Sequence, residues 1–316
     1  MDEALIAVRA VQLASTAITA GVLIFSLVVA GPVFRAAAEP GIANVLSAWN
    51  CRIAWTGLAL VALSGIAWLV LQTSAMSGRP LGEALADGLI WVVLSQTHFG
   101  AVSIVRGVIL VLLVVSLILP WTRFRWFGAP MISVVLVATI AWTGHAAGTV
   151  GRTSPLHLAA DALHLLAASA WIGGLIPLLL LLGEASRRNE TNGQSIALHA
   201  AQRFSTLGIV SVGVLLATGL INSWILIGSL RGLVDTDYGQ LVLLKVVLFA
   251  AMLSVAAVNR MRLTPRLGDP PGSLPQVEAL RKLKRNIGIE IVIGLGVFAV
   301  VGVLGTLHPA IHLVPA

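Results

Sequence analysis

The sequence predicts an all-α membrane protein: a polytopic bundle of about eight transmembrane helices with both termini on the extracytoplasmic side. Three observations carry this prediction. Of the 316 residues, 58% are apolar and only 10% are charged, whereas a soluble chain has about 25% charged residues. The apolar residues form runs of about 20, the length that crosses a hydrocarbon core. Lysine and arginine gather beside alternate ends of these runs, as expected from the positive-inside rule.

Eight apolar runs are long enough to be spans, and together they predict a single integral membrane domain over residues 1–316. The first run lacks the basic start and small-residue cleavage site of a signal peptide, so we expect it to be retained. A further apolar patch at 84–97 is too short to cross and contains an acidic residue, which favours a short interfacial helix. The eight predicted spans are residues 10–34, 52–75, 102–120, 131–149, 156–182, 205–228, 240–259 and 287–307.

The basic residues predict the orientation of these spans. Five of them flank the even-numbered connections or the N-terminus: Arg9, Arg79, Arg106, Arg152 and Arg231. Fourteen flank the odd-numbered connections: Arg35, Arg52, Arg123, Arg125, Arg187, Arg188, Arg203, Arg260, Arg262, Arg266, Arg281, Lys282, Lys284 and Arg285. This excess predicts cytoplasmic odd-numbered connections. The net charge of +7 is then explained by topology, and we expect no nucleic-acid partner.

Six of the seven histidines fall on the outer side in this topology, and only His199 falls on the inner side. Neutral imidazole is a common ligand of copper, zinc, iron and nickel. The grouping therefore predicts a metal-capture site that opens to the extracytoplasmic space. The six are His98 before the third span, His145 at the end of the fourth, His157 and His164 in the fifth, and His308 and His312 after the eighth.

The fifth span carries the most informative stripe. His157, Asp161 and His164 are spaced by four and three residues, so they share one helix face. His164 lies about 10 Å further along the helix than His157. Ionisable groups at membrane depth are costly and usually functional. We predict that the stripe binds a metal, with Asp161 as a ligand or as an acceptor that orients an imidazole. Trp171, one heptad further, would pack or form a wall of the site.

Two basic residues lie near the outer ends of other spans: Arg106 in the third and Lys245 in the seventh. Each could pair with Asp161 or repel cations, and the alternative is that its charged end reaches the interface. Met76, at the outer end of the second span, could add a thioether ligand for Cu(I).

The remaining polar residues within spans have structural explanations. Asn222 and Asn259 are expected to form hydrogen bonds between helices. Glu290 lies near the inner end of the eighth span, where Arg260 or Arg285 could pair with it; the alternative is a ligand on the release side of a permeation path.

Several function classes lack their motifs. The single cysteine, Cys51, excludes a CxxC site and a disulfide framework. No GxxxxGK[ST], HExxH or GxSxG occurs, so we expect no enzyme activity, and any transport would be passive or ion-coupled. The basic, proline-rich loop 260–286 predicts contact with anionic membrane lipid.

Five segments resemble the copper resistance protein D (CopD) family of bacterial inner-membrane proteins, over roughly residues 90–310. The resemblance implies an eight-helix protein that moves copper inward across the cytoplasmic membrane, commonly with a periplasmic, copper-binding CopC partner. We expect that partner to be separate or absent, because no CopC domain is fused here. The segments are TGHAAG (143–148), HLAADALHLLAASAWIGGL (157–175), RFSTLGIVSVGVLLATGLIN (203–222), YGQLVLLKVVLFAAMLSVAAVNR (238–260) and LGTLHPA (304–310).

The resemblance implies that the metal is copper. The leading hypothesis is a permease that captures copper at its periplasmic face. The resemblance also implies a residue set. Two alternatives stay open: a b-type haem electron-transfer protein, with His145 and either His157 or His164 as axial ligands, and a copper-delivery or assembly factor that does not transport. The implied residues are His145, His157, Asp161 and His164, supported by Trp171, Lys245 and Asn259.

Overall fold

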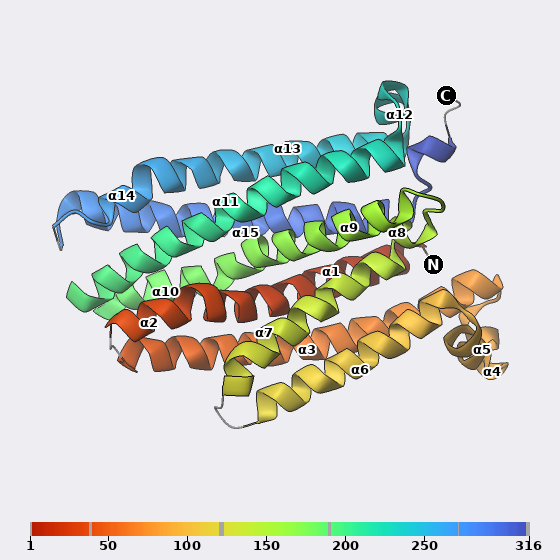
Figure 1. Ribbon diagram of the computed structural model, residues 1–316, viewed down its shortest axis with the longest axis horizontal. Coiled ribbons are helices and arrows are strands. Elements are labelled where there is room, and N and C mark those ends of the chain that lie inside the picture. Colours follow the sequence, from red (N-terminus) through yellow and green to blue (C-terminus); the bar gives the residue numbers. More distant parts are fainter. Residues whose placement is uncertain (1, 38–39, 120–122, 189–190, 271, 314–316) are drawn as a thin grey trace.

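A computed structural model describes residues 2–37, 40–119, 123–188, 191–270 and 272–313, and within them it contains helices but no strand. The long helices run side by side along the longest axis of the molecule (Figure 1). In chain order the helices are α1 (Asp2–Phe25), α2 (Gly31–Ala37), α3 (Pro40–Ser77), α4 (Leu81–Ala86), α5 (Leu89–Gln96), α6 (His98–Ile118), α7 (Arg123–Ala138), α8 (His145–Gly148), α9 (Ser154–Ala168), α10 (Gly174–Arg188), α11 (Thr191–Ile227), α12 (Leu230–Asp235), α13 (Asp237–Val258), α14 (Thr264–Arg266) and α15 (Leu274–Leu304).

Within these residues, seven helical segments are long and apolar enough to cross a membrane, and an eighth, Phe127–Thr143, is shorter. The predicted all-α polytopic bundle is thus confirmed. Three of the seven segments are α-helices that continue through a π-helical turn: Ser26–Ala30, Ser169–Gly173 and Asn259–Leu263. The seven segments are Glu3–Ala37, Pro40–Ser77, His98–Ile118, Ser154–Arg187, Asn192–Ile227, Asp237–Arg266 and Leu274–Leu304.

Within the described residues, all eight helical segments begin before the predicted spans, but four of them end earlier than predicted; the segment predicted at 131–149 ends at Thr143. The segment predicted at 205–228, for example, begins at Asn192. Hydrophobicity marks only the part that lies in hydrocarbon, whereas a helix continues until its backbone hydrogen bonds are interrupted. The last residue of the predicted span 102–120 lies outside the described residues, as do the side chains of Arg123, Arg125 and Arg188.

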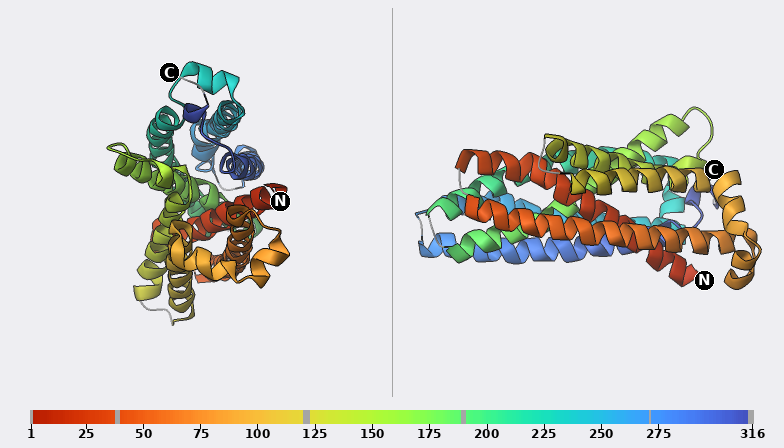
Figure 2. Two further views of the ribbon diagram at one scale, coloured as in Figure 1. Left: turned by 90° about the vertical axis from the view of Figure 1, so that its right-hand side faces the viewer. Right: turned by 90° about the horizontal axis from the view of Figure 1, so that it is seen from below.

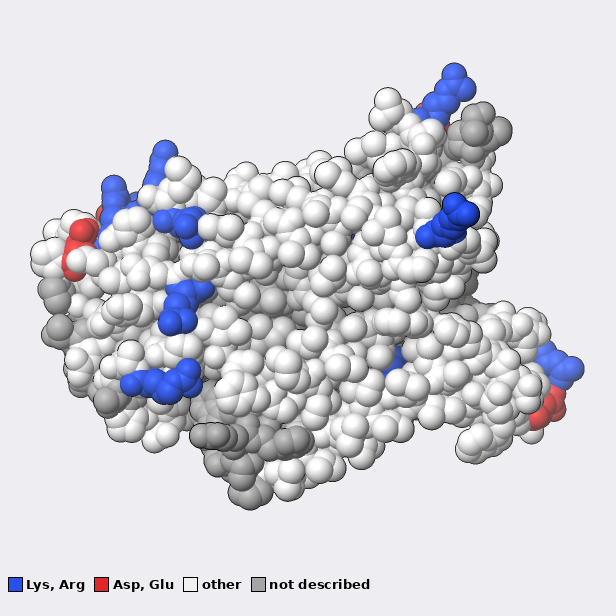
Figure 3. Space-filling model, in the orientation of Figure 1, with Lys and Arg blue, Asp and Glu red and all other residues white. Residues whose placement is uncertain are grey.

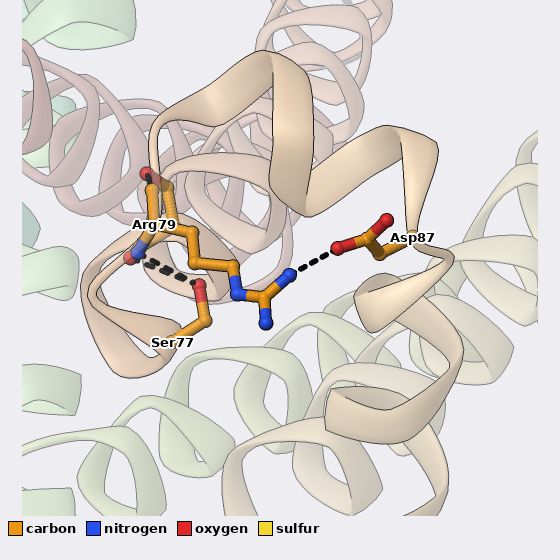
Figure 4. A network of polar contacts seen from close by, with 4 residues as sticks. Ser77, Arg79 and Asp87 are labelled. Carbon is orange, nitrogen blue, oxygen red and sulfur yellow. Dashed lines mark hydrogen bonds and ion pairs between the residues drawn. The ribbon is translucent and has the colours of Figure 1, made fainter.

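The patch at 84–97, predicted to be one interfacial helix, forms two short helices, α4 and α5. The chain turns between them at Gly88, whose φ of 66° lies in the left-handed region that glycine adopts readily. Arg79, which precedes α4, forms an ion pair and hydrogen bond with Asp87, which follows it (Figure 4). The backbone N–H of Arg79 also donates to Ser77 Oγ at 3.4 Å, so polar contacts hold the connection together.

Helix α1 joins the two halves of the bundle. Its residues Leu13 and Ala17 belong to the larger hydrophobic core, with residues of α10, α11 and α15. Leu23 belongs to a smaller core with α3, α6 and α7. Because α1 packs in both cores, it positions the cavities on either side of it.

A close crossing in this arrangement lies between α1 and the π-helical turn Ser169–Gly173. A Cβ added to Gly173 would lie 2.5 Å from Ala17 O and 2.9 Å from Gly21 Cα. Only glycine allows the two backbones to approach this closely, which is the small-residue packing typical of membrane helices. The crossing fixes the depth and rotation of the helix that carries His157, Asp161 and His164.

Both α1 and α15 have their chain-terminal ends at the same end of the bundle, together with α8 and α12 (Figures 1 and 2). On the face shown in Figure 3, lysine and arginine gather mainly toward the opposite end, where α2 and α14 lie. This separation agrees with the charge asymmetry in the sequence. The orientation of the termini across the membrane stays a prediction.

Candidate functional site

A cavity of about 370 Å³ lies inside the bundle and is lined by residues of α1, α8, α9, α11, α13 and α15. Six of the residues predicted to form or support the metal site line it. Their presence in one cavity shows that the fourth, fifth and seventh predicted spans lie close together in space, although they are separated in the sequence. The six are His145, His157, Asp161, His164, Trp171 and Lys245.

Two helices face this cavity with the same spacing. On α9 and the following π-helical turn, His157, Asp161, His164 and Trp171 all line it. On α13 the lining residues Tyr238, Lys245 and Met252 are seven residues apart, which keeps them on one helix face. The sequence reasoning missed Tyr238 and Met252, although heptad spacing on either side of Lys245 was a signal for both. It also treated Arg9, another lining residue, only as a topology signal.

His145 is held with one nitrogen free. Its Nε2 lies 3.1 Å from the carbonyl oxygen of Leu304, which can only accept, so Nε2 carries the proton and Nδ1 keeps its lone pair. Its ring packs edge-on against Tyr238, with centroids 5.8 Å apart. Burial is the largest influence on this imidazole, which lies outside the candidate spans, and lowers its pKa. His145 is therefore neutral near pH 7, the form that binds metals.

His157 is 1% exposed, and its Nδ1 lies 2.7 Å from Thr149 Oγ1. The Thr149 hydroxyl also donates to the carbonyl oxygen of His145 at 3.3 Å. Since one hydroxyl has one proton, the consistent arrangement has His157 Nδ1–H donating to Thr149. This leaves Nε2 with its lone pair. An imidazole whose other N–H is held by an oxygen is the usual state of a metal-binding histidine.

His164 follows the same pattern but its second nitrogen is occupied. Its Nδ1 lies 2.9 Å from Thr218 Oγ1, whose hydroxyl donates to Val214 O at 2.6 Å. Its Nε2 lies 3.3 Å from Lys245 Nζ. A lysine ammonium can only donate, so Nε2 accepts from Lys245. The position where a metal would bind His164 is thus taken by a cation of the protein.

Asp161 lies between the two histidines of the stripe. Its Oδ1 accepts a hydrogen bond of 3.4 Å from Asn222 Nδ2 on α11, an interhelical bond of the kind predicted for Asn222. Lys245 lies within electrostatic range of the same carboxylate, but the ion pairs among the described residues do not include Lys245 with Asp161, so their predicted pairing stays a prediction. Lys245 therefore acts on both Asp161 and His164.

The other predicted histidines lie elsewhere. His98 is exposed at the start of α6, and His308 and His312 are exposed beyond the end of α15; none of the three lines the cavity. His308 and His312 lie near enough to His145 to disfavour its protonation. Among the described residues, no three His, Cys, Asp or Glu side chains form a group that could hold a metal ion. The structure thus forms a row of groups along a cavity, where the sequence suggested one cluster.

Arg106 does not reach Asp161. It donates from Nη1 to Leu136 O at 3.3 Å and to Thr139 Oγ1 at 2.9 Å, contacts with α7 and the turn after it. The helix register of α6 turns this side chain toward α7 and away from α9. Arg106 therefore belongs to a different part of the bundle from the cavity described above.

Glu290 also has a different partner from the expected arginines. Its Oε1 accepts from Asn259 Nδ2 at 2.6 Å, and Asn286 Nδ2 donates to Asn259 Oδ1 at 2.8 Å. Arg260 instead donates to Ser205. Asn259 thus joins α13 to α15, as predicted for this residue, because its position in a π-helical turn directs its amide toward α15.

These features define a polytopic membrane protein with a histidine-lined internal cavity, and sequence comparisons give its family. The family described as "Copper resistance protein D" matches residues 198–304. The family described as "Copper resistance protein D-like, N-terminal domain" matches residues 1–155. The second match extends the resemblance to the first two spans, which the sequence motifs had not reached. Residues 156–197, which include the histidine stripe of α9, lie between the two matches.

Three relatives share 29–34% identity with the chain. "Copper transport protein CutJ" of Bacillus subtilis is 34% identical over 78% of this chain and 45% of its own length. "Inner membrane protein YebZ" of Escherichia coli is 32% identical, over 77% and 82% respectively. "Copper resistance protein D" of Pseudomonas syringae is 29% identical, over 78% and 80%. The matched region is thus less than half of CutJ. No solved structure matches the chain.

The chain belongs to the copper resistance protein D family. Its seven candidate spans and its similarity to a relative named as an inner membrane protein make it a multi-pass inner-membrane protein. This confirms the family and the location that the sequence motifs indicated.

Proposed function

We propose that this protein binds copper through the histidines of its cavity and carries the ion from the periplasmic side toward the cytoplasm. The observation that carries the proposal is the row of His145, His157 and His164. Each imidazole has one nitrogen hydrogen-bonded to a protein oxygen. The second nitrogen keeps its lone pair in His145 and His157, and in His164 it accepts a hydrogen bond from Lys245. Imidazole is a suitable copper ligand, and the family's copper-related names support this choice of metal.

The arrangement favours passage over permanent storage. Conduction needs sites that bind well enough to admit an ion and weakly enough to release it. A row of one- or two-ligand positions provides this, whereas a closed group of three or four ligands would hold the ion. Copper would first meet His145 and His157 near the end of the bundle that carries α8. It would then pass Asp161 and reach His164.

Lys245 makes the step to His164 conditional. Copper can bind His164 Nε2 only after the Lys245 ammonium leaves it, and Asp161 provides a nearby carboxylate that can receive that ammonium. Beyond Lys245, the thioether of Met252 is a soft ligand that suits Cu(I). Trp171 and Phe249 then close this part of the cavity, with ring centroids 6.0 Å apart and perpendicular planes. These rings would have to move for the ion to continue.

The exposed histidines at the same end of the bundle would have a separate role. His98, His308 and His312 lie outside the cavity, where a copper-carrying protein could reach them. We propose that they receive copper from a periplasmic partner of the CopC type and pass it to His145. In this proposal the protein is a permease and not an enzyme, because each step is a ligand exchange.

The proposal is tested with purified protein in liposomes that contain a copper-sensitive dye. Wild-type protein should admit copper faster than empty liposomes, and His157→Ala should reduce the rate to the background. His199→Ala is the matched control, because His199 is exposed and, in the described part of the chain, its hydrogen bonds are to Ser195 of its own helix. Uptake that equals the background in the wild type would overturn the transport proposal. A Soret band and bound iron in the same preparation would instead favour the haem alternative.

Lys245→Leu should raise the affinity for copper by about tenfold or more. Two like charges about 4 Å apart repel by about 4 kcal/mol at an effective dielectric constant of 20, so removing the ammonium removes a large penalty at His164. Lys245→Arg keeps the charge and should leave the affinity low. The affinity is measured by competition with a copper chelator. Weaker binding in Lys245→Leu would show that Lys245 supports the site and does not compete with copper.

A further inference from the structure

A second cavity, of about 300 Å³, lies on the other side of α1 and has no place in the proposed copper path. It is lined by residues of α1, α3, α5, α6 and α7, among them Gln12, Trp68 and Arg106. Thr143 and Trp68 line both cavities, so the two spaces adjoin at these side chains. The second cavity contains a buried cation, which calls for a physical explanation.

Arg106 is 8% exposed and has only neutral partners. Its Nη1 donates to a backbone carbonyl and a threonine hydroxyl, while its Nη2 has no hydrogen-bond partner among the described residues. The ion pairs that the structure shows among those residues do not include Arg106. A buried guanidinium without a counter-charge is costly, so this site favours an anion.

Neighbouring groups also offer donors. Trp68 is 5% exposed, and its Nε1–H has no partner among the described residues. The guanidinium of Arg9 lies over the ring of Trp68, 5.0 Å from its centroid, and Arg9 Nε is likewise without a partner in the described part of the chain. Arg106 and Trp68 therefore supply unsatisfied N–H groups among the residues that line the second cavity, and Arg9 supplies one where Trp68 borders the first cavity. A ligand at this place must be an acceptor.

The walls of the cavity show what kind of anion fits. Ile66 of α3 and Ile104 of α6 line the cavity and are 62% and 52% exposed. They belong to spans, so this exposed surface faces the hydrocarbon region and the cavity opens sideways between α3 and α6. Arg106 lies about 12 Å along α6 from His98 at the helix end. An amphiphile can place its head at Arg106 while its tail remains in the membrane.

We propose that the second cavity binds the phosphate-bearing headgroup of an anionic membrane lipid. The phosphate oxygens accept hydrogen bonds from Arg106 Nη2 and from the indole of Trp68, and an acyl chain leaves between Ile66 and Ile104. Guanidinium pairs with phosphate through charge-assisted hydrogen bonds, which are stronger than neutral ones. The site lies outside the proposed copper path, because its lining includes none of the cavity histidines.

The test uses the full chain in nanodiscs that contain equal amounts of phosphatidylglycerol and phosphatidylcholine. The protein is released from them and analysed by native mass spectrometry. Wild-type protein should retain phosphatidylglycerol in preference to phosphatidylcholine. Arg106→Gln should lower this preference by about tenfold, the effect of losing a charge-assisted hydrogen bond. Arg79→Gln is the matched control, because Arg79 is exposed and already paired with Asp87.

A second variant guards against misfolding of Arg106→Gln. Ile66→Trp keeps Arg106 and narrows the opening, so it should also lose the preference for phosphatidylglycerol. Equal retention of both lipids by the wild type, or unchanged retention in both variants, would overturn the proposal. Equilibrium dialysis with inorganic phosphate separates the two sources of the anion. Phosphate binding that depends on Arg106, without any lipid preference, would keep the anion site and overturn the lipid as its occupant.

Discussion

The double variant His157→Ala/His164→Ala is expected to lose stoichiometric copper binding, with an affinity at least about 100-fold below that of the wild type. Loss of a group that only orients a ligand costs about 10–100-fold, and this variant removes two proposed ligands. Of the proposed ligands that line the cavity, His145 and Asp161 would remain. Copper is measured by elemental analysis of the detergent-purified protein after loading and desalting.

The single variants divide this effect between the two positions. His157 has a free Nε2, whereas His164 Nε2 is held by Lys245. His157→Ala should therefore lower the affinity more than His164→Ala. Copper that remains bound in the double variant would move the binding site to His98, His145, His308 or His312. Iron in place of copper in all preparations would point to the haem alternative.

Gly173→Val is expected to destabilise the protein by about 3 kcal/mol or more, at the upper end of what overpacking costs. The added Cβ would lie 2.5 Å from Ala17 O and 2.9 Å from Gly21 Cα. Both are backbone atoms, which cannot turn aside as the end of a long side chain can. The variant should therefore force α1 away from the π-helical turn that carries Trp171. The measurement is the midpoint of thermal unfolding in detergent.

Gly183→Val is the matched control for this prediction. Gly183 lies further along the same membrane-spanning segment, and a Cβ there would have no neighbour within 4 Å. Both variants add the same β-branched side chain, so their difference isolates the close crossing. Equal unfolding midpoints for Gly173→Val and Gly183→Val would show that α1 can move without loss of stability.

The most specific property of the site is that His164 Nε2 already has a partner. The Lys245 ammonium occupies the position where a metal would bind, and the Asp161 carboxylate that can accept this ammonium is nearby. A metal that binds His164 must displace Lys245, so weakly bound cations are at a disadvantage. This arrangement would favour a metal with high affinity for imidazole, and copper(II) leads the divalent first-row metals in that order.

Part of this protein could be predicted from its sequence, because the physical constraints are local. In a membrane, a single chain segment can satisfy its own backbone hydrogen bonds only as a helix. Each span is therefore marked by the hydrophobicity of one segment of the sequence. The spacing of His157, Asp161 and His164 on one helix face is likewise a property of the sequence. The family motifs at 143–175 and 203–260 identified the copper resistance protein D family, whereas spacing alone does not distinguish one metal from another.

Tertiary structure decided the rest, because it depends on how helices rotate against one another. The sequence did not indicate that Arg106 faces α7 while Lys245 reaches His164, although both are basic residues near span ends. It did not indicate that Glu290 binds Asn259. Heptad spacing puts Tyr238 and Met252 on the same helix face as Lys245, but only the structure shows that this face lines the cavity with α9. Each of these depends on helix rotation set by close contacts such as Gly21 with Gly173. The sequence alone determined the spans, the polar stripe and the family, and packing determined which polar groups meet.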